Sequence, residues 1–209
     1  MTTETLKTGT TTVALVCKDG IVLAADQKAT MGHLVASKNA KKVHEITDRM
    51  AMTIAGSVGD AQALIRILKA EMQLYELQEK ATSTKAAATL LSNILRGAYK
   101  SYVPEMVQLV LGGYDSRGPH LYSVDAAGGL SEETDYAFSG SGSVIAVGVL
   151  EDSYKKDMTA AEGVSLLLRA IKAARERDVF SGGNLMDVAV ITEKGIEWIE
   201  KEKIKKLVN

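Results

Sequence analysis

The sequence predicts an α+β fold, a four-layer sandwich in which two antiparallel sheets are flanked by helices. Two observations lead to this prediction. Many short runs have strand composition, and several of them, such as residues 13–16 and 21–25, are apolar on both faces. Three longer segments have helical periodicity. Strands that are apolar on both faces need cover on both sides, and a second sheet on one side with helices on the other provides it.

The first and last predicted strands form hairpins. Residues 10–17 and 21–26 are joined by Lys18-Asp19-Gly20, and Asp-Gly between two such runs favours a tight turn. Residues 187–192 and 196–199 flank a similar connection, Glu193-Lys194-Gly195. Further short strands bounded by turn residues are expected at 33–36, 43–46, 50–55, 106–112, 120–124 and 134–139.

Three helices are expected between these strands. Apolar residues recur at helical spacing from Ala61 to Tyr75 and again from Ala87 to Ala98, which predicts an antiparallel helical pair. A third helix is expected to start after Thr159, because Glu162 three residues later completes a capping box, and to end near Arg177.

The composition restricts the classes of protein to which the chain can belong. Its 209 residues, 46% of them hydrophobic, fit one domain. The 25 Lys and Arg residues nearly balance the 26 Asp and Glu residues, so neither nucleic acid nor an anionic membrane is an expected partner. Apolar runs such as 144–150 are only of strand length, too short to span a membrane. The single Cys17 excludes a disulfide scaffold and fits a buried core position in a cytoplasmic protein.

Several common catalytic motifs are absent from the sequence. The three histidines, His33, His44 and His120, form no HExxH motif, and there is no GxSxG elbow, so neither a zinc enzyme nor a Ser-His-Asp enzyme is expected. Residues 140–143, GSGS, could mimic a phosphate-binding loop, but a lone pair of glycines is a weak signal. We therefore expect neither a metal nor an organic cofactor.

The run Gly9-Thr10-Thr11-Thr12 could simply be the β-branched start of a strand, but it also permits a specific chemistry. A threonine hydroxyl needs a base, and an N-terminal threonine carries one in its own α-amine. With a pKa of about 8, roughly a tenth of that amine is unprotonated at neutral pH, against about one in a few thousand for an ordinary lysine. Gly9 leaves the preceding carbonyl sterically open, so Thr10 could attack it and remove residues 1–9 as a propeptide.

From Gly9 onward the chain resembles the archaeal-type proteasome β subunits, which are N-terminal-nucleophile (Ntn) hydrolases. The segments that carry the resemblance are GTTTVAL, AADQKAT, NAKKVHEI, MTIAGSVGDAQ, LLSNIL, MVQLVLGGYD, YSVDAAGG, SGSGS, RERDVFSGG and MDVAVIT, and it is their order and spacing together that is specific. The resemblance implies the Ntn-hydrolase fold for a single domain, residues 10–209, after self-cleavage of 1–9.

The resemblance also implies roles for particular residues. Thr10 would be the nucleophile, Asp26 an orienting carboxylate and Lys42 the catalytic ammonium, although these charges could also be ordinary solvated strand positions. Strand alternation lets only one of Lys41 and Lys42 face the interior, and only the resemblance selects Lys42. The backbone N–H of Gly56 would hold the oxyanion. The residues expected around the Thr10 amine are Ser141, Asp178 and Ser181, which could otherwise serve only in caps and turns.

The implied substrate pocket has mostly apolar walls, which favours cleavage after hydrophobic residues. Its expected lining residues are Ala29, Ala40, His44, Ile54 and Val58, with Thr30 supplying backbone hydrogen bonds to an extended peptide. His44 departs from the apolar residue expected there and could equally point outward.

The implied assembly is a seven-membered β ring stacked on a second one and flanked by rings of proteasome α subunits. A regulatory ATPase would deliver unfolded protein substrates to it. Two other hypotheses remain: a non-catalytic ring subunit, which would lack one of Thr10, Asp26 and Lys42, and another kind of Ntn hydrolase.

Overall fold

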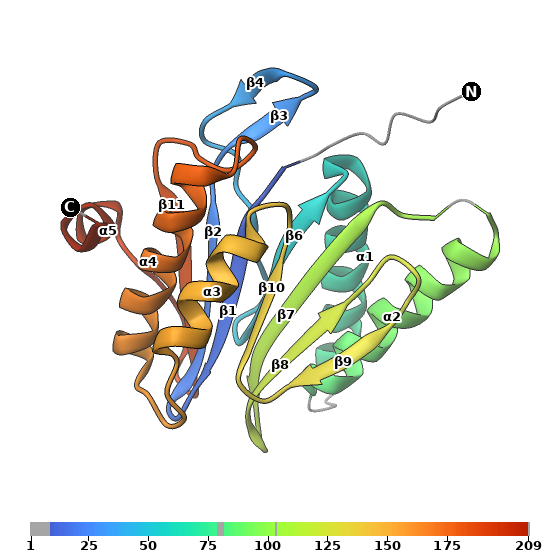
Figure 1. Cartoon of the computed structure of the whole chain (residues 1–209). Helices are drawn as coiled ribbons and strands as arrows, with labels where there is room; N and C mark the ends of the chain where they lie inside the picture. The colour runs from blue at the N-terminus through green and yellow to red at the C-terminus, as the bar shows by residue number, and fades with distance from the viewer. Residues whose placement is uncertain (1–8, 79–81, 103, 209) are drawn as a thin grey trace.

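The structure, a computed structural model, describes residues 9–78, 82–102 and 104–208, and it contains the predicted four layers (Figure 1). The first sheet has the strand order β10-β1-β2-β11-β12, all antiparallel. Its strands are β1 (Thr12–Cys17), β2 (Gly20–Asp26), β10 (Tyr136–Ser139), β11 (Met186–Thr192) and β12 (Gly195–Trp198).

The second sheet has the strand order β5-β6-β7-β8-β9 and is also antiparallel. Its strands are β5 (Val43–Thr47), β6 (Met50–Gly56), β7 (Val107–Asp115), β8 (Gly118–Val124) and β9 (Leu130–Glu133). A separate small hairpin, β3 (Ala29–Met31) with β4 (Leu34–Ser37), projects from one end of the sandwich (Figure 1).

Helices cover the outer face of each sheet. The helices α1 (Val58–Leu77) and α2 (Thr84–Lys100) lie on the second sheet, while α3 (Ser143–Ser153) and α4 (Ala160–Arg177) lie on the first, with α5 (Lys201–Val208) against α4 (Figure 1). The buried apolar residues accordingly form three clusters, one between the two sheets and one under each pair of helices. The prediction that β1 and β2 are buried on both faces is confirmed for every residue of β2 and for every residue of β1 except Val16, which is half-buried.

The capping box predicted at the start of the third helix is also present. The Glu162 carboxylate accepts a hydrogen bond from the Thr159 backbone N–H at 2.7 Å, and the Thr159 hydroxyl caps the first turn of α4. The first hairpin turn is tighter than predicted, because Gly20 is already paired with Cys17 and only two residues form the turn.

Some elements were missed by the sequence analysis. The apolar run 144–150 lies in helix α3, where Ala146 and Leu150 are buried but Val144 is exposed. Because the buried and the exposed positions of this run are both apolar, its composition did not show the helical spacing. Strands β3 and β9 are short and largely exposed, and they are held by backbone pairing that leaves little apolar signal. The charged helix α5 buries only Ile204. The strand predicted at 134–139 begins at Tyr136.

A line of buried hydroxyl groups joins the two sheets near the start of β1. The Thr53 hydroxyl on β6 donates to the Thr12 hydroxyl at 3.2 Å, and the Thr12 hydroxyl lies 2.6 Å from that of Ser139 on β10. These polar atoms satisfy one another inside the core, as buried polar groups must. They connect the two sheets at Thr12, the residue that follows Thr11.

Candidate active site

Thr10 lies two residues before the start of β1 and is only 4% exposed. Its hydroxyl donates a hydrogen bond to the carbonyl oxygen of Gly9 at 2.7 Å, and its backbone N–H donates to the Ser141 hydroxyl at 3.4 Å. Its own carbonyl oxygen accepts from the Gly142 N–H at 3.2 Å. The potential nucleophile is therefore fixed on both sides and lies against the peptide bond that precedes it.

Lys42 reaches the same carbonyl group. Its ammonium donates to Asp26 Oδ1 at 2.7 Å and lies 3.4 Å from the Gly9 carbonyl oxygen. Of the two adjacent lysines it is Lys42 that points inward, whereas the Lys41 ammonium lies 4.5 Å from the centre of the Trp198 ring. The structure therefore brings Thr10, Asp26 and Lys42 together around one peptide carbonyl.

Asp26 is the most highly hydrogen-bonded carboxylate of this site. It is fully buried at the end of β2. Besides Lys42, it accepts backbone N–H groups of Thr11 at 2.9 Å, Lys28 at 3.1 Å and Gly182 at 2.8 Å. Charge-assisted bonds of this kind hold a carboxylate in a single orientation. Asp26 can therefore both neutralise the Lys42 ammonium and aim it at Gly9.

The charge state of Lys42 depends on opposing effects. Burial lowers the pKa of the Lys42 ammonium below its ordinary value of 10.5, while the Asp26 carboxylate raises it and offsets part of the shift. A buried amine whose pKa is lowered loses its proton at a lower pH than a surface lysine does.

Gly56 ends β6 and lines the pocket that contains Thr10. Its φ of +114° is one that residues with a side chain rarely adopt, and an added Cβ would lie 2.0 Å from the carbonyl oxygen of Met106. This position consequently requires glycine for two independent reasons.

Ser141, Asp178 and Ser181 form a second polar group on the other side of Thr10. The Asp178 carboxylate accepts from the Ser141 hydroxyl at 2.7 Å and from the Ser181 hydroxyl at 2.5 Å. The Ser181 hydroxyl is also 2.5 Å from that of Thr11. Through Ser141 this group reaches the backbone nitrogen of Thr10.

A pocket of about 240 Å³ opens beside Thr10. All six residues expected to bind substrate line it, namely Ala29, Thr30, Ala40, His44, Ile54 and Val58. His44 is half-buried with Nε2 3.1 Å from the Lys41 carbonyl oxygen, and burial lowers the pKa of its imidazole. The hydroxyl of Thr30 is buried and has no hydrogen-bond partner.

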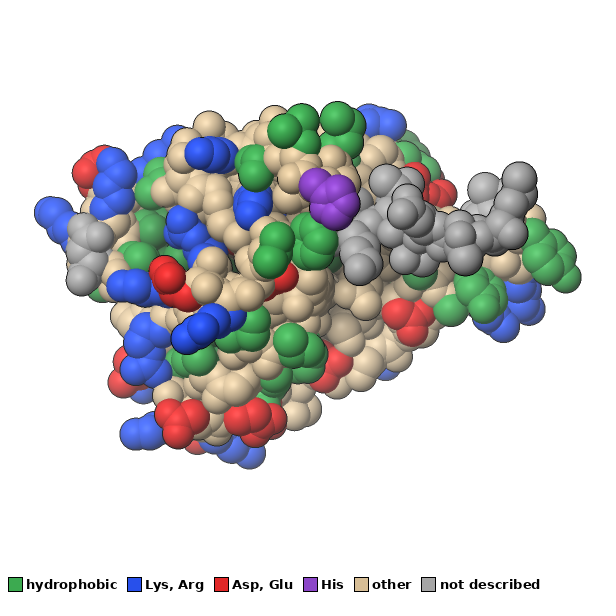
Figure 2. Space-filling model, turned by 45° about the horizontal axis from the view of Figure 1, so that its top comes forward, with side chains coloured by type: hydrophobic (Ala, Val, Ile, Leu, Met, Phe, Trp, Pro, Cys, Tyr) green, Lys and Arg blue, Asp and Glu red, His purple; other side chains and the backbone are tan. Residues whose placement is uncertain are grey.

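Four further residues belong to this region, although no role was predicted for them from the sequence. Lys28, Lys41 and Gln62 also line the pocket, and Asp187 accepts the backbone N–H of Lys42 at 2.9 Å. Each lies inside or next to a segment that carried the resemblance, but no local pattern distinguishes it from a surface residue. Figure 2 turns this end of the molecule toward the viewer and shows apolar side chains gathered there beside Lys and Arg side chains.

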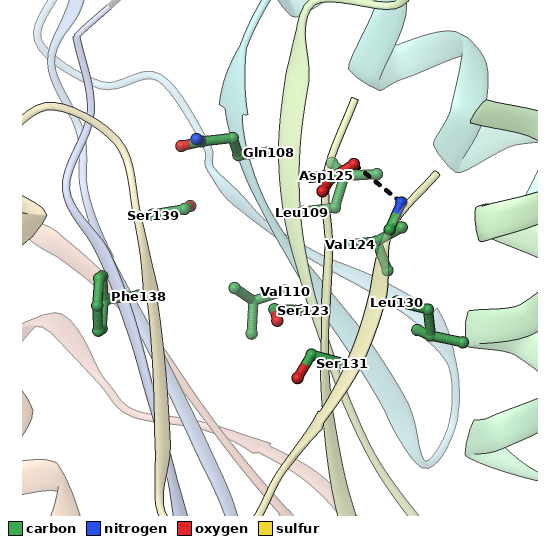
Figure 3. A pocket seen from close by; sticks show the side chains of 11 residues that line it. Gln108, Leu109, Val110, Ser123, Val124, Asp125, Leu130, Ser131, Phe138 and Ser139 are labelled. Carbon is green, nitrogen blue, oxygen red and sulfur yellow. Dashed lines mark hydrogen bonds between the residues drawn. The ribbon is translucent and has the colours of Figure 1, made fainter. Parts of the chain in front are cut away.

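A second hollow, of about 340 Å³, lies between β7, β8, β9 and β10 (Figure 3). Gln108 and Ser139 line it, together with Asp125, whose carboxylate accepts the Gly129 N–H at 2.9 Å. None of the predicted catalytic residues lines this hollow. The combination of a nucleophile, a cation and a carboxylate therefore distinguishes the Thr10 pocket as the candidate active site.

Known proteins resemble this chain over most of its length. Residues 6–191 match the proteasome subunit family. The chain belongs to the proteasome subunit family. It is 52% identical to the proteasome subunit beta of Methanosarcina barkeri over 200 residues, which are 95% of this chain and 93% of that protein. It is 51% identical to the subunit beta of Methanocaldococcus fervens (96% and 89% covered) and 50% identical to that of Archaeoglobus profundus (96% and 93%).

The resemblance read from the motifs is thereby confirmed at the level of the family, and so is the predicted fold class. These relatives support a β subunit of the proteasome, a protease, that assembles with other proteasome subunits. Within the described part of the chain, no helix has the length and apolar character needed to cross a membrane. The expected propeptide falls mainly on residues 1–8, which lie outside the described residues.

Proposed function

We propose that this chain is the catalytic β subunit of a proteasome core particle, a threonine endopeptidase that acts through an acyl-ester on Thr10. One observation carries the proposal. The Thr10 hydroxyl and the Lys42 ammonium both lie within hydrogen-bond distance of the Gly9 carbonyl oxygen, and Lys42 is paired with Asp26. A non-catalytic ring subunit has no need of this arrangement.

The same arrangement suits removal of residues 1–9. The Thr10 oxygen attacks the carbonyl carbon of Gly9, and an ester forms as the bond between that carbon and the Thr10 nitrogen breaks. The hydroxyl proton passes to neutral Lys42 or to water, and the departing nitrogen takes up a proton. Water then hydrolyses the ester, which releases residues 1–9 and leaves Thr10 with a free α-amine.

Cleavage of substrates repeats this chemistry on an external peptide bond. The α-amine of Thr10 is now available as a base, and Ser141 with Asp178 and Ser181 lies where it can orient that amine. Lys42 supplies positive charge beside the Thr10 oxygen, and the Gly56 N–H would hold the oxyanion, a contact typically worth about 3 to 4 kcal/mol.

The pocket supports a preference for cleavage after hydrophobic residues. Ala29, Ala40, Ile54 and Val58 provide apolar walls, and the lowered pKa of His44 keeps its imidazole neutral at neutral pH. For partners we propose proteasome α subunits, further β subunits in stacked seven-membered rings, and a regulatory ATPase that supplies unfolded proteins in the cytoplasm.

The experiment that tests this function is the intact mass and N-terminal sequence of the subunit after assembly with its α partner, with Thr10→Ala as the control. Loss of residues 1–9 in the wild type but not in the variant, together with peptidase activity only in the wild type, is expected. A full-length wild-type chain in assembled particles would instead favour the non-catalytic ring subunit. Hydrolysis of small amides without α subunits would favour another Ntn hydrolase.

A further inference from the structure

The backbone of Lys42 lies outside both sheets. It belongs to the connection between β4 and β5, which begins at Val43. A residue in such a connection has no strand ladder to fix its N–H group. The Lys42 N–H instead donates to Asp187 Oδ2 at 2.9 Å, and its carbonyl oxygen accepts from the Ile54 N–H on β6 at 3.0 Å.

Asp187 lies on β11, which is paired with the strand that carries Asp26. The register places Asp187 opposite Ala25 and Met186 opposite Asp26. Two carboxylates from neighbouring strands therefore hold the same lysine, Asp26 by its ammonium and Asp187 by its backbone.

The orientation of the Asp187 carboxylate is itself fixed. Its second oxygen, Oδ1, accepts a hydrogen bond from the Gln27 side-chain amide at 2.7 Å. Gln27 is buried directly after Asp26, and its backbone carbonyl accepts the Ala40 N–H at 2.9 Å. Gln27 and Asp187 thus attach residues 40–42 to the first sheet at two points, one on each side of Lys41.

The position of this backbone decides what the Lys42 side chain can reach. Its ammonium is 2.7 Å from Asp26 but 3.4 Å from the Gly9 oxygen, close to the limit of a hydrogen bond. A lysine side chain has four rotatable bonds, so Asp26 alone does not define where its ammonium lies relative to Thr10. A displacement of about 1 Å at a catalytic group can lower a rate by about 10²-fold.

We propose that Asp187, oriented by Gln27, is a positioning residue that fixes the backbone of Lys42 so that its ammonium faces the carbonyl attacked by Thr10. This inference rests on the proposed function and extends it to a residue that contributes only through Lys42.

The hydrogen bonds of Asp187 and its charge can be separated by substitution. In Asp187→Asn the amide oxygen can still accept the Lys42 N–H, and its NH₂ group can donate to Gln27 once the Gln27 amide turns over. Both hydrogen bonds survive and the charge is lost. Asp187→Ala removes both bonds, while Gln27→Ala leaves the Asp187 carboxylate bound to Lys42 but no longer oriented by an amide.

A control for loss of structure is provided by Asp115. This buried carboxylate also accepts a backbone N–H from another element, that of Thr84 at 3.0 Å, and it lines none of the Thr10 pocket. Asp115→Ala should lower stability without changing the activity of assembled particles. A purely structural role for Asp187 predicts the same result for Asp187→Ala.

The test measures kcat and KM of assembled particles on a fluorogenic peptide across a series of pH values. Asp187→Ala should lower kcat by about 10²-fold, with a smaller change in KM. Asp187→Asn should keep most of the kcat. Because the Asp187 charge raises the pKa of Lys42, the Asn variant should move the limb of the pH profile that depends on Lys42 to lower pH. Gln27→Ala should lower kcat several-fold.

The outcomes separate this inference from the proposed function. If the wild type is active, Thr10→Ala is inactive and Asp187→Ala keeps its kcat, only the inference fails. If Asp187→Ala does not assemble, an unchanged kcat in Gln27→Ala overturns it. If the wild type is no more active than Thr10→Ala, the proposed function fails. In that case, hydrogen exchange of the peptide containing residues 38–43 tests whether Asp187 holds this segment. Exchange as slow in Asp187→Ala as in the wild type would overturn the inference about Asp187.

Discussion

Replacing Asp26 by alanine should destabilise the chain far more than a single contact would suggest, because this carboxylate is the shared acceptor of four groups. It receives the backbone N–H groups of Thr11, Lys28 and Gly182 and the ammonium of Lys42, and no part of it is exposed. Alanine leaves all four without their acceptor.

The magnitude follows from the burial of those groups. Thr11 is fully buried, and an unsatisfied buried N–H costs about 1 to 3 kcal/mol. Lys42 is 5% exposed, and removing the partner of a buried charge costs about 3 to 5 kcal/mol. Lys28 and Gly182 are less buried, so water can replace part of their loss. We expect a loss of about 5 kcal/mol, close to the whole stability of some domains.

Replacing the other partner of the pair, Lys42, should lower the free energy of unfolding by less. In Lys42→Met the Asp26 carboxylate keeps its three backbone donors, and the methionine side chain fills most of the space of the lysine stem. We therefore expect a loss of about 3 kcal/mol or less, at the low end for a broken buried pair.

The assay is urea unfolding of the full-length chain, with Thr10→Ala in every variant so that the N terminus stays the same. The free energy of unfolding should fall in the order control, Lys42→Met, Asp26→Ala. The reasoning is refuted if Asp26→Ala is no more destabilising than Lys42→Met, because the three backbone bonds would then contribute nothing measurable.

Three further predictions concern single residues. Gly56→Ala should lower peptidase kcat by about 10²-fold or more, because the new Cβ would lie 2.0 Å from the carbonyl oxygen of Met106. The matched control is Gly97→Ala, whose new Cβ would have no atom within 4 Å. Equal activity of the two variants would contradict the prediction. Burial, with Asp19 and Glu162, raises the pKa of the Cys17 thiol from 9.0 to about 12, so the native chain should react with a thiol reagent about 10³-fold more slowly than the urea-unfolded chain. The stabilising contribution of this protonated thiol should be complete below pH 9 and disappear as the pH rises toward 12, and rapid native labelling would show the thiol to be accessible. Because burial lowers the pKa of His44 from 6.5, the rate ratio for peptides cleaved after acidic over apolar residues should rise only below pH 6.5, and a similar rise in His44→Gln would exclude His44 as its cause.

The sequence predicted the layers well because their signals are local. Strands β1 and β2 are apolar on both faces, and this alone requires two covering layers. The start of α4 was predictable because a capping box consists of two residues three apart. Helix α3 was not, since its apolar run gives no periodicity, and β3 and β9 depend on pairing with β4 and β8 rather than on their own composition.

The same distinction applies to the candidate site. From the sequence alone, a threonine after glycine suggested a possible chemistry, and the order of the motifs indicated the family and, through that resemblance, Thr10, Asp26 and Lys42 as candidate site residues. The choice of Lys42 over Lys41 as the inward residue needed the resemblance, because alternation along a strand allows either one.

Only the tertiary structure decided which partners hold these groups. Asp187 is 145 positions from the lysine whose backbone it binds, and Ser141 is 131 positions from Thr10. Neither contact can be recognised in the local sequence, because the residues around a strand aspartate or a turn serine look the same whether its side chain faces solvent or the candidate active site. The sequence determined which chemical groups are present, and the pairing of strands distant in the chain determined which of them meet.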